Sequence, residues 1–262
     1  MSSESILADE MATTLSAFAL GNVLLGFDYD GTLAPIAATP ARARMRPTTH
    51  RLLQRVARAY PCVAISGRAL ADITRRLEHV PMWHVFGNHG SERTTAGPVN
   101  WTREWVAALH AALCGIPGVL VEDKAYSVTV HYRAAEDQLA ARSAVLKAAR
   151  RLADVRIVGG REAINLLRRD APDKGSALAY AVRAFACNTA MYIGDDDTDE
   201  DAFAALPPDR LLGIRIGAAP PSSRARFHLE SQKEIDALLE RLLLFRREIR
   251  NGHVRQAFEF NS

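Results

Sequence analysis

Short apolar runs that stop abruptly at polar residues recur along this chain, and they constrain its fold more than any other feature. Three of them are 23–27 before Asp28, 62–65 before Ser66, and 191–193 before Gly194. Runs of this length predict buried strands, and the stretches between them carry the spacing of amphipathic helices. Strands and helices in this alternation predict a parallel α/β sheet.

The remaining elements of the expected sheet follow from the same pattern. Further strands are predicted at 83–86 and 211–216, and helices at about 4–20, 47–60, 72–77, 174–185, 198–206 and from near residue 233 onwards. Ligands of open α/β sheets bind beyond the carboxyl ends of the strands. The candidate functional residues are therefore those that follow the strands.

The rhythm changes between about residues 96 and 170. After a turn at Gly97-Pro98, helices are predicted at 103–113 and 136–152, and strands at 119–122, 126–132, 155–158 and 163–167, with a Gly159-Gly160 hairpin turn. The order helix, strand, strand occurs twice, as expected of a small open sheet with helices on one face. We predict a core made of residues 1–95 and 171–262, interrupted by an inserted α/β cap at 96–170.

Composition narrows the class of protein. The 262 residues carry 33 Lys and Arg against 30 Asp and Glu, a net charge of +3, which argues against a strongly basic nucleic-acid binder. Cys62, Cys114 and Cys187 fit neither a disulfide framework nor a Cys-x-x-Cys metal site. The acidic first eleven residues are unlike a signal peptide, and the apolar stretch that follows is too short for a bilayer. We expect a cytoplasmic protein without membrane or nucleic-acid partners, and the oligomeric state is left open.

Two carboxylates follow the first strand, in the segment Asp-Tyr-Asp-Gly-Thr at 28–32. The turn that Gly31 permits can bring Asp28 and Asp30 toward one site beyond the strand end. One carboxylate can then act as a nucleophile while the other transfers protons. The alternative is an acidic loop that only follows a strand.

An acidic run, Gly-Asp-Asp-Asp-Thr-Asp-Glu-Asp at 194–201, follows another strand. An EF-hand is excluded, because its sixth position would be Glu200 instead of Gly and its twelfth Leu206 instead of Glu. Carboxylates at a helix N-terminus complement the helix dipole. So many of them nevertheless repel one another unless a cation is bound, and a hard ion such as Mg²⁺ is expected.

Two further motifs suit a phosphate group. Ser66-Gly67-Arg68 follows the second strand and offers a hydroxyl and main-chain amides, and Lys174-Gly175 opens a helix and offers a point charge. Each motif alone is also compatible with an ordinary turn or a solvated lysine. Walker-type, Gly-x-Ser-x-Gly and His-Glu-x-x-His patterns are absent from the sequence, which argues against P-loop hydrolases, serine hydrolases and zinc peptidases.

Together and in this order, the four motifs resemble those of the haloacid dehalogenase superfamily of aspartyl-phosphate phosphatases. The insertion between the second and third motifs matches the larger cap type of that superfamily. Three segments narrow the resemblance to the trehalose-6-phosphate phosphatase family: Asn-His-Gly-Ser-Glu-Arg at 88–93, Glu-Asp-Lys at 122–124 followed by His-Tyr-Arg at 131–133, and the acidic run.

The resemblance implies a haloacid dehalogenase-like Rossmannoid core with a parallel sheet and an inserted cap. It also implies Mg²⁺-dependent hydrolysis of trehalose 6-phosphate to trehalose and phosphate, the last step of trehalose biosynthesis. Asp28 would form an aspartyl-phosphate and Asp30 would transfer protons, while Ser66 and Lys174 neutralise the phosphate. The Mg²⁺ ligands would be the Asp28 carboxylate, the Asp30 carbonyl and Asp195, with Asp199 orienting groups around them.

The same resemblance implies a sugar-phosphate site between core and cap. Cap closure would bring Glu122, Lys124 and Arg133 over the sugar. The residues expected to bind substrate are Thr32, Gly67, Arg68, His89, Glu92, Glu122, Lys124, Arg133 and Asn165.

One position departs from the family pattern. Where the family has a glutamate in a Glu-x-Lys/Arg-Pro segment, this chain reads Ile-Asn-Leu-Leu-Arg at 164–168, so that Asn165 replaces a carboxylate. This departure leaves open a phosphatase for another glycosyl phosphate, such as glucosylglycerol phosphate or a mannosyl phosphate. Two other classes also stay open because related proteins belong to them, namely a phosphomannomutase-like phosphotransferase and a catalytically silent regulatory domain.

Overall fold

The computed structural model describes residues 4–37, 39–92, 101–160, 162–218 and 220–259. Its strands are β1 (Glu4–Ser5), β2 (Val23–Phe27), β3 (Cys62–Ile65), β4 (His84–Phe86), β5 (Leu120–Asp123), β6 (Val128–His131), β7 (Val155–Gly160), β8 (Ala163–Arg168), β9 (Thr189–Gly194), β10 (Leu211–Ile216) and β11 (Phe227–Leu229). Its α-helices are α1 (Ala12–Ala19), α2 (Pro47–Ala59), α3 (Leu70–Arg76), α4 (Trp101–Leu113), α5 (Gln138–Ala149), α6 (Lys174–Ala184), α7 (Glu200–Phe203) and α8 (Ile235–Glu259). Short 3₁₀ helices are η1 (Asp9–Met11), η2 (Pro40–Arg42), η3 (Asn88–Gly90), η4 (Asp197–Asp199) and η5 (Gln232–Glu234).

Seven parallel strands form the core sheet, in the order β1-β11-β10-β9-β2-β3-β4. Strand β2 lies between β9 and β3 and is buried along its whole length. Strands covered on both faces need continuous apolar runs, which explains why the pattern at 23–27 and 62–65 predicts the strand bounds so well. The α/β class and the parallel sheet predicted from the sequence are confirmed.

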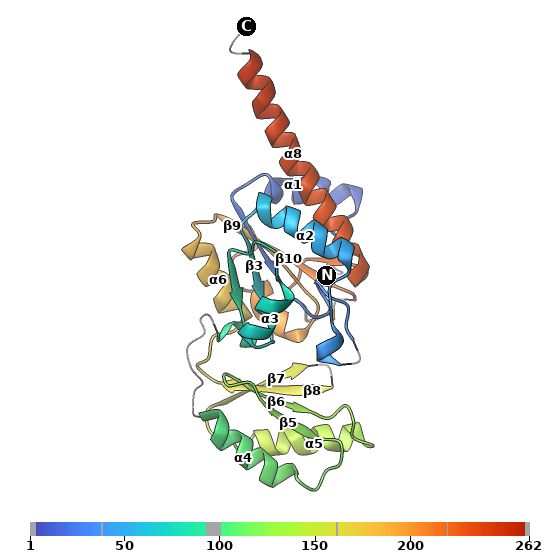
Figure 1. The fold of residues 1–262 in the computed structure, drawn as a ribbon, viewed down its shortest axis with the longest axis vertical. Helices are drawn as coiled ribbons and strands as arrows, with labels where there is room; N and C mark the ends of the chain where they lie inside the picture. Colours follow the sequence, from blue (N-terminus) through green and yellow to red (C-terminus); the bar gives the residue numbers. More distant parts are fainter. Residues whose placement is uncertain (1–3, 38, 93–100, 161, 219, 260–262) are drawn as a thin grey trace.

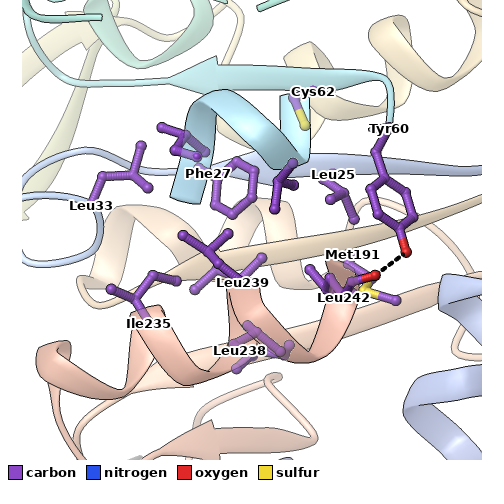
Figure 2. Close-up of a cluster of buried hydrophobic side chains, with 14 of the residues drawn as sticks. Leu25, Phe27, Leu33, Tyr60, Cys62, Met191, Ile235, Leu238, Leu239 and Leu242 are labelled. Atoms are coloured by element: carbon purple, nitrogen blue, oxygen red, sulfur yellow. Dashed lines mark hydrogen bonds between the residues drawn. The ribbon is translucent and has the colours of Figure 1, made fainter. Parts of the chain in front are cut away.

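One face of this sheet is covered by α1, α2, α3 and α8, and Figure 1 shows α8 running past α1 and α2 and projecting from the core. The apolar side chains of α8 pack with Phe27 and Met191 in a buried cluster (Figure 2). The hydroxyl of Tyr60 donates a hydrogen bond of 2.9 Å to the carbonyl of Leu242 within that cluster. This bond satisfies a phenol that is only 2% exposed and ties α2 to α8.

Helices α6 and α7 cover the opposite face of the core sheet. Leu24 and Val63 point to this side and pack against Leu178 and its neighbours on α6. Gly26 belongs here as well, because a Cβ at this position would lie 2.8 Å from the ring of Tyr192. The core is therefore a three-layer α/β structure.

A separate antiparallel sheet, in the order β5-β6-β8-β7, lies below the core in Figure 1. Helices α4 and α5 pack on its outer face through a cluster that includes Trp105, Val128 and Val130. Thr129 and His131 alternate with those valines, so they lie on the face turned toward the core. The predicted arrangement of a small sheet with helices on one face is confirmed.

Two local expectations are wrong, and one strand was not predicted. The segment 4–20 is not one helix, because β1 pairs with β11 before η1 and α1 begin. Strand β11 itself was not expected from its three-residue pattern. Gly159 and Gly160 lie inside β7, paired with Ile164 and Ala163, and are not the hairpin turn.

The limits of the cap at 95/96 and 170/171 stay a prediction. The first limit and the expected Gly97-Pro98 turn fall within 93–100, outside the described residues. Among the described residues, no helix combines the length and the apolar character needed to cross a membrane. The three cysteines are free thiols, of which Cys62 and Cys187 are buried.

Candidate active site

The polar residues that follow the strands gather at one edge of the core sheet. Strands β9, β2, β3 and β4 are direct neighbours, and their carboxyl ends are followed by Asp195, Asp28, Ser66 and Asn88. Parallel neighbours place their following loops side by side. Motifs far apart in the sequence thus form one site.

A buried ammonium group holds two carboxylates at the centre of this site. Lys174, the first residue of α6, donates 2.9 Å to Asp28 Oδ1 and 2.7 Å to Asp199 Oδ1. Burial alone would lower the pKa of Lys174, but the charges of these two carboxylates outweigh burial and raise it. Burial raises the pKa of Asp28 well above its ordinary value, and neighbouring carboxylates add to this effect against the opposing charge of Lys174. The ammonium therefore stays charged and orients Asp28.

Gly31 makes room for a third carboxylate. Its φ of +83° is the left-handed conformation that favours glycine, and a Cβ there would lie 2.0 Å from Asp195 Oδ2. The Thr32 hydroxyl donates a long hydrogen bond of 3.4 Å to Asp195 Oδ1. Burial and the charge of Asp199 raise the pKa of Asp195 to about 7.

Asp199 anchors the acidic loop. It is fully buried, and its two oxygens accept from Lys174, from the Tyr192 hydroxyl at 2.7 Å and from the main-chain N–H groups of Asp195 and Asp196 at 3.0 Å. A Cβ at Gly194 would lie 2.2 Å from Asp199 Cγ, so only glycine allows this approach. Asp199 thus fixes the loop that carries Asp195.

The three carboxylates suit a divalent cation. Asp28, Asp195 and Asp199 each offer an oxygen, and these oxygens lie within 4.8 Å of one another. Lys174 contributes one positive charge against the three carboxylates, so the cluster keeps excess negative charge. The raised pKa values of Asp28 and Asp195 reflect this excess together with burial. An all-oxygen donor set fits a hard divalent metal.

Asp30 is not one of those three carboxylates, and Arg68 binds both of its carboxylate oxygens. Arg68 Nε and Nη2 donate to Asp30 at 2.6 and 2.5 Å, while Nη1 donates to Asp72 Oδ2 at 2.8 Å. The Asp30 side chain is 40% exposed, whereas that of Arg68 is 9% exposed. The contact of the Asp30 carbonyl with a metal stays a prediction, and the substrate contact of Arg68 does too.

The loop after β3 faces the turn after β4. Ser66 is 1% exposed, and its hydroxyl accepts from the Arg68 N–H at 3.2 Å. A Cβ at Gly67 would lie 2.6 Å from the ring of His89, so the imidazole packs directly on this glycine. Among the described residues, buried His89 Nδ1 has no hydrogen-bond partner. Burial, with the charge of Lys174, lowers the pKa of His89 well below its ordinary value.

On the cap, two expected residues, Glu122 and Asn165, lie with Thr129 in one cross-strand row on the face turned toward the core. Glu122 on β5 pairs with Thr129 on β6, which pairs with Asn165 on β8. The Thr129 hydroxyl donates to Asn165 Oδ1 at 2.8 Å, and Glu122 Oε2 contacts His131 Nε2 at 2.8 Å. The bond to His131 is the main reason that the pKa of Glu122 is lowered.

The other expected substrate residues have different surroundings. Burial lowers the pKa of Lys124, whose ammonium lies close enough to Asp30 and Arg68 to be affected by their charges. Arg133 lies beyond the end of β6 and donates to Glu162 at 2.7 Å, and its substrate contact stays a prediction. Glu92 Oε2 accepts from the N–H of Leu70 and the amide of Asn88, so both bonds are structural.

Sequence reasoning did not select three residues that shape the site. Tyr192 holds Asp199, and nothing in its apolar strand marks it. Arg215 is 7% exposed and donates to the carbonyl of Asp196 and to Glu200, and its signal is a charge inside the apolar run 211–216. Asn88 contacts the cap, and it was visible only as part of a motif.

Comparison with known proteins relates this chain to a family. Residues 26–233 match the family model described as trehalose-phosphatase. The trehalose-phosphate phosphatase of Mycolicibacterium paratuberculosis is 34% identical over 238 residues, which cover 82% of this chain and 61% of that protein. That of Mycobacterium tuberculosis is 32% identical over 248 residues, which cover 87% of this chain and 62% of the relative. The chain thus spans about three fifths of the length of these curated relatives.

Solved structures share the fold. The C-terminal domain of the trehalose-6-phosphate phosphatase of Candida albicans superposes with a TM-score of 0.77 at 20% identity, covering 92% of this chain and 98% of that one. The sucrose-phosphatase of Synechocystis, solved with sucrose and phosphate, gives 0.56 at 15% identity, covering 86% and 98%. A haloacid dehalogenase-like hydrolase of Bacillus subtilis gives 0.60 at 15% identity, covering 83% and 98%. The fold is therefore haloacid dehalogenase-like, and with the family match over residues 26–233 the chain belongs to the trehalose-phosphatase family.

Proposed function

We propose that the protein is a Mg²⁺-dependent phosphatase that hydrolyses trehalose 6-phosphate to trehalose and phosphate, the last step of trehalose biosynthesis. The observation that carries the proposal is the buried Asp28 carboxylate, which Lys174 holds at 2.9 Å at the end of β2. A nucleophile fixed in this way needs little reorganisation before attack. The family match from residue 26 to 233 supports the same activity.

The reaction proceeds in two displacements. Asp28 forms a bond to phosphorus as the bond to the sugar oxygen breaks, and Asp30 gives a proton to that oxygen. Asp30 then takes a proton from water as the water oxygen bonds to phosphorus and the Asp28–phosphorus bond breaks. The 40% exposure of the Asp30 side chain supports this role, because it leaves a path to solvent and substrate.

Positive charge is needed because an anionic nucleophile approaches an anionic phosphate. Lys174 supplies one charge, and the Ser66 hydroxyl would donate a hydrogen bond to a phosphate oxygen. Asp28, the Asp30 carbonyl and Asp195 would hold the Mg²⁺, with Asp199 fixing their loop. When bound, Mg²⁺ would neutralise the charge that develops on the transferred phosphoryl group.

The identity of the sugar phosphate rests on the residues of the cap. Glu122, Lys124 and Asn165 belong to the cap, and we expect a sugar attached to the phosphate to contact them, because their acceptors and donors suit hydroxyl groups. Asn165 favours a second candidate, a phosphatase for another glycosyl phosphate. Within the described residues its Oδ1 is occupied by Thr129 while its Nδ2 donates to no partner, so it offers donors to the sugar.

A panel of phosphate-release assays on the purified protein tests the proposal. Trehalose 6-phosphate, glucosylglycerol phosphate, a mannosyl phosphate, glucose 6-phosphate and p-nitrophenyl phosphate are compared in Mg²⁺ and in EDTA. We expect trehalose 6-phosphate to have the highest kcat/KM, and EDTA to abolish activity until Mg²⁺ is restored. If another glycosyl phosphate has a higher kcat/KM than trehalose 6-phosphate, the second candidate function is supported instead.

Two further results would reject hydrolysis altogether. Isomerisation of a hexose phosphate that depends on a bisphosphate would indicate a phosphotransferase. Binding of trehalose 6-phosphate without phosphate release would indicate a regulatory domain. Full activity in EDTA would contradict the metal requirement.

A further inference from the structure

The turn after β4 has an unusual backbone. Asn88, His89 and Gly90 have φ values of +47°, +57° and +98°, so two consecutive residues with side chains adopt the left-handed conformation. Asparagine tolerates the left-handed conformation better than most residues. Even for asparagine, this conformation is less favourable than a right-handed one. Paired main-chain hydrogen bonds between Gly87 and Glu92 close the turn at 2.9 and 3.1 Å. Something other than local preference must stabilise this geometry.

The Asn88 side chain supplies that stabilisation, because all of its polar groups are used. Its Nδ2 donates to Glu92 Oε2 at 2.8 Å on the core side and to the carbonyl of Lys124 at 3.2 Å on the cap. Its Oδ1 accepts from the Ser127 hydroxyl of the cap at 3.1 Å. Asn88 is fully buried and Ser127 is 1% exposed, so water does not compete for these bonds.

The hydrogen bonds around Asn88 connect to the candidate active site on both sides, in the core and in the cap. On the core side, the Asn88 N–H donates to the Arg68 carbonyl at 2.7 Å, and the His89 N–H donates to the Ser66 carbonyl at 2.9 Å. On the cap side, Lys124 and Ser127 are paired across the turn between β5 and β6, with the Lys124 N–H donating to the Ser127 carbonyl at 2.9 Å. Asn88 therefore joins the phosphate loop to the hairpin that carries Lys124.

We propose that Asn88 is a positioning residue that fastens the cap hairpin 123–128 to the core and so sets Lys124 above the substrate. The role of Lys124 rests on the proposed function, whereas the fastening does not. Aspartate could not replace Asn88, because it would turn an oxygen toward both the Glu92 carboxylate and the Lys124 carbonyl. Glycine would keep the left-handed turn and remove only the side chain.

Hydrogen–deuterium exchange tests the fastening independently of any activity. In the Mg²⁺-loaded protein, Asn88→Gly should raise the exchange rate of peptides spanning 123–128 by about tenfold, since both buried hydrogen bonds to the cap are lost. Asn88→Asp should also raise it, because the donation to the Lys124 carbonyl is replaced by an oxygen facing an oxygen, although the Ser127 hydroxyl can still donate to the carboxylate. Peptides from β2 and β9 should not change. Ser16→Ala, which removes an exposed hydroxyl bond on α1, is the matched control and should leave the hairpin unchanged. Unchanged exchange at 123–128 in both Asn88 variants would overturn the proposal.

Steady-state kinetics test the positioning. Asn88→Gly should raise KM for the best glycosyl phosphate of the panel by about tenfold, and it should affect p-nitrophenyl phosphate much less. Ser127→Ala should have a smaller effect of the same kind. The double variant should be no worse than Asn88→Gly alone, because both changes remove one shared contact.

The outcomes separate this inference from the proposed function. Faster hairpin exchange with an unchanged KM for every glycosyl phosphate would overturn the positioning role. Equal losses on the glycosyl and aryl phosphates would do the same, because they would indicate a damaged core. A wild-type protein that releases no phosphate would reject the proposed function alone, and the exchange experiment would still decide whether Asn88 fastens the cap.

Discussion

The core and cap sides of the site differ in how their polar groups are satisfied. Asp199 accepts from two side chains and two main-chain groups, and Lys174 contacts two carboxylates. On the cap, Asn165 and Glu122 have one side-chain partner each, and within the described residues the Lys124 ammonium has no hydrogen-bond partner. The core is thus organised before substrate arrives, whereas the cap keeps groups free for a ligand. Changes in the core should affect every substrate, and changes in the cap should depend on the substrate.

The largest expected effect is that of Asp28→Asn. The amide has the shape of the carboxylate but cannot form the acyl phosphate, so phosphate release should fall more than about a thousandfold for sugar and aryl substrates alike. Binding of the glycosyl phosphate, measured by calorimetry, should remain. Turnover within tenfold of wild type on either substrate would refute Asp28 as the nucleophile.

Gly31→Ala should also impair the core for all substrates. The added methyl would meet the Asp195 carboxylate, and the φ of +83° costs an alanine about 1–2 kcal/mol. We expect a loss of about a hundredfold in kcat/KM with both substrate types, and a higher Mg²⁺ concentration for half-maximal rate. Gly115→Ala is the matched control, because a Cβ there meets nothing within 4 Å. Similar losses in both variants would mean that the approach of Asp195 to Gly31 does not matter.

Lys124→Ala should impair the hydrolysis of glycosyl phosphates selectively, in contrast to the changes in the core. It should lower kcat/KM for the glycosyl phosphate by about ten- to a hundredfold and leave p-nitrophenyl phosphate nearly unaffected, since the aryl group has no hydroxyls to bind. Lys147→Ala, a change on the outer helix α5, controls for loss of charge on the cap. Equal losses on both substrates would assign Lys124 to folding or cap closure.

The smallest expected effect is on stability. Burial would raise the pKa of Asp72, but hydrogen bonds from Arg76, Arg68 and Arg75 lower it to about 2. Because the folded value lies below the unfolded one, this stabilisation is complete above about pH 4 and is lost as the pH falls toward 2. Asp72→Asn should lower the free energy of unfolding by about 1 kcal/mol at pH 7 and by less at pH 3, measured in urea. An equal difference at both pH values would contradict the mechanism, and exposed Asp209→Asn serves as control.

The sequence predicted the fold best where strands are buried on both faces. The bounds of β2, β3 and β10 match the apolar runs because each run is covered by helices on either side. Strand β1 could not be recognised, since Glu4 and Ser5 have no strand pattern and pair only because β11 provides an edge. The glycines at the end of β7 resemble a turn, but their pairing with β8 depends on the whole cap sheet.

The candidate site was predictable as a set of residues but not as a set of partners. Residues that follow neighbouring parallel strands must meet, which brings Asp28, Ser66 and Asp195 together. Local sequence does not decide that Arg68 pairs with Asp30 or that Asn88 reaches the cap, because those partners lie 38 and 36 residues away. Such choices depend on how the two sheets face each other.

The insertion also has a consequence for the order in which the chain folds. Lys174 and Asp28 are 146 residues apart, and β2 receives its neighbour β9 only after the whole cap. In the part of the chain that the structure describes, the cap strands β5 to β8 pair only with one another. Each doubling of a flexible loop costs about 0.6 kcal/mol to close, so prior collapse of the cap shortens the loop that the core must close. During synthesis on the ribosome, β2, β3 and β4 would form an incomplete sheet without β9 until the cap has been made. In a refolding experiment with pulsed hydrogen exchange, amides of α4 and α5 should gain protection before those of β2.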